Sequence, residues 1–468
     1  MKAISGRPPE IRLRRAALRG GVFLAARQVV SIMLKFVGVM LITRVLGPAA
    51  YGAYVSGVNI YQYAVAIGAA GVGVYLLRHE GDVPEASYGT AYSILLATSL
   101  LLLGAIEIGA GGLARWTGVA GFEPVMRIII FGLPLQLLAM PASVRLERRL
   151  DYRSVAMIEI AGQVAFYVLA VPLVMLKFGP GALALAWVVQ QTITCLAAHL
   201  ASQTYPRFTL NRSVAVGIVR YAADYSVANW IWQLRMLVNP LIVGPALGAR
   251  AVGIVGMTVG LLEMLSIIKT IAWRLSVAIL TKFRSDVERL RTAVTEGMEL
   301  QVLAVGAILL GFGWVGQFLV PRLFGVRWLG VMEIYPYIAL SYLTQAAFNI
   351  HSATFSVIGR NRDLAVYHMV SVPIFAAVAY FAVSRVGIVG YGYAELATIP
   401  AYFLMHFFLA RAIGSPDYRV AVLWWFGAAV GLFWRIGLWA VAVPFVVLVL
   451  PVSLRKLRKL LRDARRRS

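Results

Sequence analysis

Several basic side chains lie within apolar stretches that are long enough to cross a membrane, and Lys35 and Arg235 are the clearest cases. A charge that faces lipid at such depth costs about 2.5 to 3.5 kcal/mol on insertion scales. For about six such cations the cost would be on the order of 15 to 20 kcal/mol. We therefore expect these side chains to face a hydrated internal cavity, and a cationic cavity at membrane depth is suited to an anionic ligand.

The first expected span contains two of these cations on one side of the helix. Arg27, Ser31 and Lys35 are four residues apart, so they share a helical face, and Gln28 lies beside them. At about 1.5 Å of rise per residue, Arg27 and Lys35 are separated by about 12 Å along the axis. An anionic group could therefore pass from one cation to the other.

Further polar residues occur in the seventh and eighth expected spans, where amides could hydrogen-bond a polar ligand and aromatic rings could stack on it. The residues that we predict to bind substrate are Arg27, Gln28, Ser31, Lys35, Arg78, Asn229, Trp232, Gln233, Arg235, Asn239, Lys269 and Arg274. Alternatives remain for three cations. Arg274 and Arg127 could reach the membrane interfaces instead, and Arg235 could pair with Glu263.

Acidic residues at membrane depth are candidates for ion coupling, because burial favours the protonated carboxyl group. They are Glu107, Glu159, Asp224, Glu263 and Glu395. We predict that Glu263, with Asp224, carries a coupled proton, and structural pairing is the alternative for each. The five histidines have no metal-ligand spacing, so we expect no catalytic residue, metal or cofactor.

The composition indicates an all-α polytopic membrane protein. Of 468 residues, 60% are hydrophobic and only 14% are charged, which leaves no room for a large soluble domain. The apolar runs reach about 20 to 25 residues, the length of a membrane-spanning helix. Cys195 is the single cysteine, so no disulfide can form within the chain.

The distribution of basic residues predicts the orientation. With the N-terminus in the cytoplasm and alternating spans, the inner segments hold about 30 Lys and Arg and the outer segments about 8. The net charge of +24 is thus explained by topology, and we expect no nucleic acid partner. Residues 420–452 could form one span or two around Arg435, and two short helices keep the basic tail inside.

Two segments share a pattern that indicates an internal repeat. They read Leu46-Gly47-x-x-Ala50-x-Gly52 and Leu247-Gly248-x-x-Ala251-x-Gly253. Each lies at an expected outer turn, six spans apart, which favours a parallel repeat. Chance similarity between Gly-rich turns is the alternative.

We therefore expect about 14 transmembrane helices: two pseudo-symmetric six-helix bundles around a central cavity, and a C-terminal helical hairpin. The expected segments are a basic cytoplasmic N-terminus at 1–20, an N-terminal bundle at 21–202, a cytoplasmic linker at 203–216, a C-terminal bundle at 217–412, the hairpin at 413–453 and a basic cytoplasmic tail at 454–468. The tail pattern is that of a surface helix suited to anionic membrane lipids, with a solvated topology anchor as the alternative.

Several short stretches resemble the oligosaccharide flippases, the Wzx-type polysaccharide transporters of the MOP exporter superfamily. They are Ala26-Arg27-Gln28, the run Arg44-Val45-Leu46-Gly47-Pro48-x-x-Tyr51-Gly52, Gly71-Val72-Gly73 with Leu77-Arg78, the loop Leu146-Glu147-Arg148-Arg149-Leu150-Asp151-Tyr152-Arg153, and Gly359-Arg360-Asn361-Arg362. The resemblance extends over the whole chain in helix number, whereas its specific motifs are confined to these stretches.

The resemblance implies a flippase that moves a polyprenyl-diphosphate-linked oligosaccharide from the inner to the outer leaflet of the bacterial cytoplasmic membrane. It also implies that the flippase acts together with a polysaccharide polymerase and chain-length machinery. Peptidoglycan lipid precursors or small drugs are alternative substrates on the same fold. The flippases of peptidoglycan precursors have an acidic residue after the first outer turn, and this chain lacks it at Ala50–Ala53. The first span is basic here, whereas that of drug exporters is acidic. A membrane-embedded glycan-assembly enzyme is a further alternative, although the outer connections are short.

Overall fold

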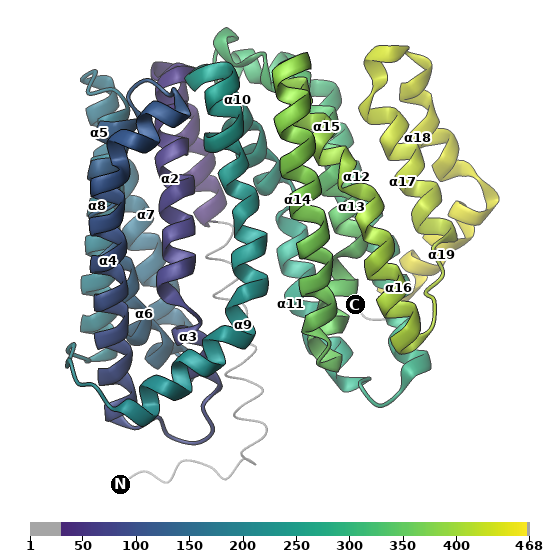
Figure 1. Cartoon of the computed structure of the whole chain (residues 1–468). Helices are drawn as coiled ribbons and strands as arrows, with labels where there is room; N and C mark the ends of the chain where they lie inside the picture. Colours follow the sequence, from purple (N-terminus) through teal and green to yellow (C-terminus); the bar gives the residue numbers. More distant parts are fainter. Residues whose placement is uncertain (1–29, 466–468) are drawn as a thin grey trace, which may run out of the picture. The chain divides into compact units, whose positions relative to one another are not determined.

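The computed structural model describes residues 30–465, apart from the side chains of residues 221–225, 228, 274, 278, 461 and 463–465. All regular elements in this range are helices. The chain divides into two compact units, one up to Gly253 and one from Ile254 onward. Within each unit the helices lie side by side along their length (Figure 1).

Unit 1 begins with a helix over residues 30–45. It continues with α2 (Pro48–Ala69), α3 (Val72–Arg78), α4 (Glu85–Thr117), α5 (Phe122–Ile129), α6 (Gly132–Arg148), α7 (Tyr152–Met175), α8 (Pro180–Ser202), α9 (Arg212–Val238), the π-helical turn η1 (Asn239–Val243) and the first part of α10 (Gly244–Leu265).

Unit 2 contains the rest of α10 and the remaining elements. They are α11 (Ile267–Lys282), α12 (Val287–Leu323), η2 (Val326–Trp328), α13 (Val331–Ile358), α14 (Asn361–Val386), α15 (Val389–Ala397), η3 (Ile399–Ala401), α16 (Tyr402–Ile413), α17 (Arg419–Leu432), η4 (Trp434–Ile436), α18 (Trp439–Val449) and α19 (Pro451–Arg465).

Within the described residues, eight helices are long and apolar enough to cross a membrane, or up to ten if each of two bent pairs counts as one span. The prediction of an all-helical multi-pass membrane protein is therefore confirmed. The number fourteen stays a prediction, and the beginning of the expected first span, residues 21–29, lies outside the described residues.

Two helical stretches are interrupted by residues with unusual backbone geometry. Ala70 and Gly71 have left-handed φ angles of 40° and 73°, and α2 and α3 meet there at a bend of 47°. Gly248 interrupts α10 with a φ of 76°, a conformation that glycine adopts without steric cost. This glycine belongs to the second copy of the repeated pattern, so a break forms where the pattern predicts a turn.

The expected linker at 203–216 is ordered against α4. The backbone N–H of Thr209 donates to the Gly89 carbonyl at 3.4 Å, and the Ser93 hydroxyl donates to the Thr209 carbonyl at 2.9 Å. Asn211 then caps α9 by accepting from the backbone N–H of Ser213 at 3.0 Å. The boundary between the two bundles at this linker stays a prediction.

In unit 2, α17 and α18 form an antiparallel hairpin on either side of η4, which contains Arg435. Gly427 packs against Val447 and Gly431 against Pro444, so small residues let the two helices approach closely. The helix α19 then turns by 62° relative to α18. These are the two short helices expected around Arg435.

Candidate functional site

Lys35 lies on the side of its helix that packs inside unit 1. Gly38 and Ile42 follow it by three and seven residues, so the three positions share a face. Gly38 is packed so tightly against the Tyr167 ring of α7 that a Cβ atom would overlap it, and Ile42 is buried in the core. The Lys35 side chain itself is exposed, one turn before the buried Gly38.

The opposite side of the same helix is apolar and exposed, at Met33, Val37 and Leu41. Residues two apart on a helix project to nearly opposite sides, so Lys35 points away from Met33 and Val37. Ser31, one turn before Lys35, is half-buried on the Lys35 side. Arg27 and Gln28 lie outside the described residues.

The predicted residues of α9 are separated from an exposed apolar side in the same way. Val227 and Leu234 are exposed, and Asn229 and Trp232 lie two residues from them on the opposite side. The Arg235 guanidinium is 5.7 Å from the centre of the Trp232 ring, within the range of a cation–π interaction. Gln233, Trp232 and Arg235 are half-buried, and Asn229 is exposed.

Asn239 is engaged in helix packing. Its side chain is buried, and its amide nitrogen donates to the Val252 carbonyl of α10 at 3.2 Å. In this conformation the amide therefore joins η1 to α10, across the turn between them.

Arg78 ends α3 and is exposed, next to an unusual cap. The Arg148 guanidinium of α6 donates to the carbonyls of Leu76, Leu77 and His79 at 3.0, 3.1 and 2.9 Å, and also to that of Gly81. The last carbonyls of a helix have no intrahelical partner, and one arginine satisfies them here. Arg148 thus holds the helix end that presents Arg78.

In unit 2, Lys269 of α11 lies against α13. Its ammonium group is 4.0 Å from the centre of the Tyr342 ring and donates to the Gln345 Oε1 atom at 3.2 Å. The Asn349 side chain donates to the Lys269 carbonyl at 2.8 Å and to the Gln301 Oε1 atom of α12 at 3.0 Å. The Arg274 side chain is outside the described residues.

These contacts belong to a polar face on α13 that sequence reasoning missed. Its members are Tyr342, Gln345, Asn349, Ser352 and Ser356. They are three or four residues apart and none is buried, whereas Leu343, Ala346, Ile350 and Ala353 on other sides of the helix are buried. The spacing in the sequence could have revealed this face.

The predicted coupling residues lie on α9 and α10. Glu263 is exposed on α10, and the Asp224 side chain is not described. Arg127 pairs with Glu107 and Glu123 at 3.1 and 2.9 Å, so Glu107 has a structural partner. Within residues 30–465 no group of three or more His, Cys, Asp or Glu could hold a metal ion.

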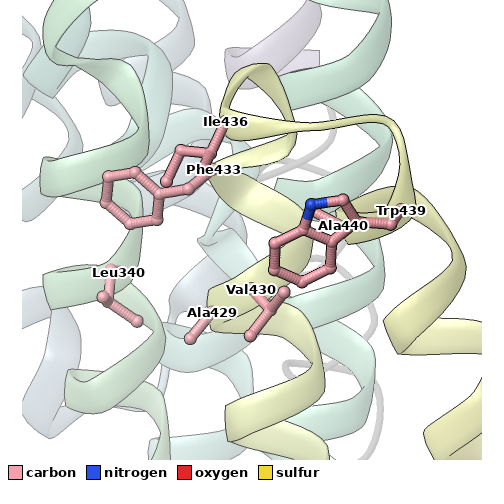
Figure 2. Close-up of a pocket in the computed structure, with 7 residues that line it drawn as sticks. All are labelled: Leu340, Ala429, Val430, Phe433, Ile436, Trp439 and Ala440. Atoms are coloured by element: carbon pink, nitrogen blue, oxygen red, sulfur yellow. The ribbon is translucent and has the colours of Figure 1, made fainter.

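A separate apolar pocket of about 280 Å³ lies between α13, α17 and α18. Figure 2 shows its lining: Leu340, Ala429, Val430, Phe433, Ile436, Trp439 and Ala440. Such a lining is suited to an apolar chain and offers no group for a phosphate or a sugar.

A family model described as polysaccharide biosynthesis protein matches residues 41–333, which is more than half of the chain. The chain belongs to this family. Among curated proteins, the succinoglycan biosynthesis transport protein ExoT of Rhizobium meliloti (strain 1021) is 27% identical over 209 residues. That match covers 44% of this chain and 42% of ExoT, so the chain spans less than half of this relative's length.

Solved structures of transporters show the same fold. The lipid II flippase MurJ, in an inward closed conformation, is similar with a TM-score of 0.70 at 11% identity, over 96% of this chain and 99% of MurJ. An inward-facing multidrug resistance MATE transporter of the MOP superfamily has a TM-score of 0.64 at 15% identity, over 84% and 98% of the two chains. The family match confirms the resemblance found in the sequence, and the solved structures show the fold that it implies.

Proposed function

We propose that this protein is a flippase that moves a polyprenyl-diphosphate-linked oligosaccharide from the inner to the outer leaflet of the bacterial cytoplasmic membrane. The position of Lys35 is the main observation that supports this proposal. An ammonium group within an apolar segment lies on the packed side of its helix, away from the exposed apolar residues Met33 and Val37. A cation held there at membrane depth is suited to a diphosphate.

The proposed architecture has fourteen spans, with six-helix bundles at 21–202 and 217–412, a hairpin at 413–453 and both termini in the cytoplasm. Reciprocal opening of two such bundles would carry the polar head group across while the lipid chain stays in the bilayer. Arg27 and Lys35 would hold the diphosphate, and Asn229, Trp232 and Arg235 would contact the sugar next to it. Glu263 and Asp224 are the proposed coupling residues, and the apolar pocket of Figure 2 suits a lipid chain.

The proposal is tested in cells that depend on this protein for polysaccharide export. Replacing both Arg27 and Lys35 by Ala should lower export at least tenfold and cause lipid-linked oligosaccharide to accumulate on the inner leaflet. Lys35→Arg, with Arg27 intact, keeps the charge and should retain most of the export. Lys282→Ala, an exposed lysine at the end of α11, is the matched control and should export normally.

Normal export by the Arg27→Ala, Lys35→Ala double variant, at equal membrane abundance, would contradict the proposal. Loss of export of a peptidoglycan precursor or of a drug, with polysaccharide unaffected, would assign a different substrate to the same fold.

A further inference from the structure

The polar face of α13 lies against a break in the neighbouring helical pair. Ser266 separates α10 from α11 with a φ of −96° and a ψ of 16°, and Lys269 follows it by three residues. Irregular backbone at membrane depth is tolerated where it is buried in protein or lines a hydrated cavity. The break and the cation therefore mark the same region of unit 2 as the polar face.

Lipid is a poor partner for this face. Tyr342, Gln345, Asn349 and Ser352 are all only half-buried, and three of them carry an amide or a hydroxyl on a short side chain that cannot reach the interface from mid-helix. Uncompensated polar groups in hydrocarbon are costly, so the unburied side of α13 must meet water or a polar ligand.

The hydrogen bonds made at this face leave one amide donor and one amide acceptor unused. Gln345 uses its amide oxygen for Lys269, and Asn349 uses its amide nitrogen for the Lys269 carbonyl and Gln301. Among the described residues, the Gln345 amide nitrogen and the Asn349 amide oxygen have no partner. One donor and one acceptor are thus presented four residues apart on the same face.

A sugar hydroxyl both donates and accepts hydrogen bonds, so a pair of neighbouring hydroxyls fits a neighbouring donor and acceptor. The Lys269 ammonium donates to Gln345 and so places a positive charge beside these amides. Its position over the Tyr342 ring fixes it beside the amides.

Two buried polar atoms beneath the face support a ligand or water site. The Gln301 Nε2 atom and the Ser266 hydroxyl have no hydrogen-bond partner among the described residues, and these residues are only 3% and 1% exposed. A buried polar group without a partner costs about 1 to 3 kcal/mol. Water that enters with a hydrated ligand would satisfy both.

We propose that Lys269, Gln345 and Asn349 form a binding subsite for the sugar part of the substrate. The Gln345 amide N–H and the Asn349 amide oxygen engage adjacent hydroxyls of a pyranose ring, beside the positive charge of Lys269. The inference rests on the proposed function, because it assigns a further sugar of the same glycan to residues of unit 2. It separates this role from the diphosphate role proposed for Lys35.

The test uses the purified full-length protein in detergent with two probes. One is the oligosaccharide released by hydrolysis of the polysaccharide that the producing cells make, without lipid or phosphate, and the other is inorganic pyrophosphate. Saturation-transfer NMR reports contact between the protein and the oligosaccharide, and 31P line broadening reports contact with pyrophosphate, which has no carbon-bound protons. We expect the wild type to bind both.

Gln345→Leu and Asn349→Leu should each weaken oligosaccharide binding about tenfold, which corresponds to about 1.4 kcal/mol, and leave pyrophosphate binding unchanged. Lys35→Ala should weaken pyrophosphate binding and leave oligosaccharide binding unchanged. Gln317→Leu is the matched control, because Gln317 is a half-buried glutamine on α12 outside this face, and it should bind both probes normally. If Gln345→Leu does not fold, Gln345→Glu keeps the acceptor for Lys269, removes the N–H donor and should still lose the oligosaccharide.

Failure of the wild type to bind the oligosaccharide overturns the inference, as does unchanged binding by the Gln345 and Asn349 variants. Pyrophosphate binding that depends on Lys35 would leave the proposed function standing in either case. Loss of that binding as well, together with normal export in cells that lack the protein, would overturn the proposed function itself.

Discussion

Gly52 and Gly253 pack against each other as equivalent positions of the two repeated segments. A Cβ atom on Gly52 would overlap the carbonyl oxygen of Ala249, and a Cβ atom on Gly253 would overlap that of Pro48. The same offset along the chain relates Gly52 to Gly253 and Pro48 to Ala249. The contact is therefore reciprocal, and only glycine at both positions allows α2 and α10 to approach so closely.

Gly52→Val or Gly253→Val should destabilise the protein by about 1 to 3 kcal/mol, because backbone atoms, unlike flexible side chains, cannot move aside cheaply. The thermal midpoint of the purified protein measures the effect. Gly260→Val is the control, since a Cβ at this position of α10 meets nothing within 4 Å. Equal stability of the Gly52, Gly253 and Gly260 variants would show that the close approach is absent.

The hydroxyl of Tyr418 joins two histidines from different helices. It lies 2.6 Å from the His351 Nε2 atom of α13 and 3.0 Å from the His406 Nδ1 atom of α16. His351 is fully buried. Since Tyr418 precedes α17, this cluster ties the C-terminal hairpin to the rest of unit 2.

Tyr418→Phe should therefore cost about 1 to 3 kcal/mol, because it keeps the ring but leaves the buried His351 nitrogen without a partner. Tyr205→Phe, at an exposed tyrosine, should be neutral in the same thermal denaturation measurement. A neutral Tyr418→Phe would mean that the hydroxyl bridge contributes nothing.

Two lysines of α19 pair with glutamates of α12 in different surroundings. Lys456 lies 2.6 Å from Glu299, which is almost completely buried, and Lys459 lies 2.8 Å from Glu296 in an exposed pair. Breaking a buried pair leaves an uncompensated charge and costs about 3 to 5 kcal/mol, whereas exposed pairs contribute about 0 to 1 kcal/mol.

Lys456→Ala should thus release α19 for limited proteolysis, and Lys459→Ala should not. A Glu299→Gln, Lys456→Ala double variant should recover part of the loss, because the buried charge is gone. Identical proteolysis rates for both single lysine variants would contradict this difference.

The sequence predicted the parts of the fold that depend on composition and spacing. The long apolar runs predicted an all-helical chain, and the glycine of the second repeat interrupts its helix at Gly248. Helical spacing placed Lys35 on one face with Ser31 and Arg27, of which Arg27 lies outside the described residues.

Side-chain partners could not be predicted, since they depend on which helices meet. Asn239 has the residue type of a sugar ligand, yet its amide is used by the Val252 carbonyl. Arg127 pairs with Glu107 on α4, which was a coupling candidate, and with Glu123 on its own helix. The polar face of α13 does not stand out by charge, because its side chains are uncharged amides and hydroxyls within an apolar helix.

The direction in which Lys35 points is tested most directly by cysteine labelling in intact membranes. In a Cys195→Ser background, which removes the single native cysteine, Lys35→Cys, Met33→Cys and Val37→Cys are treated with a charged, water-soluble thiol reagent. We predict that the cysteine at position 35 reacts rapidly and that those at positions 33 and 37 react at least tenfold more slowly. Rapid reaction at 33 and 37 with protection at 35 would contradict a hydrated cationic interior, and with it the proposed flippase.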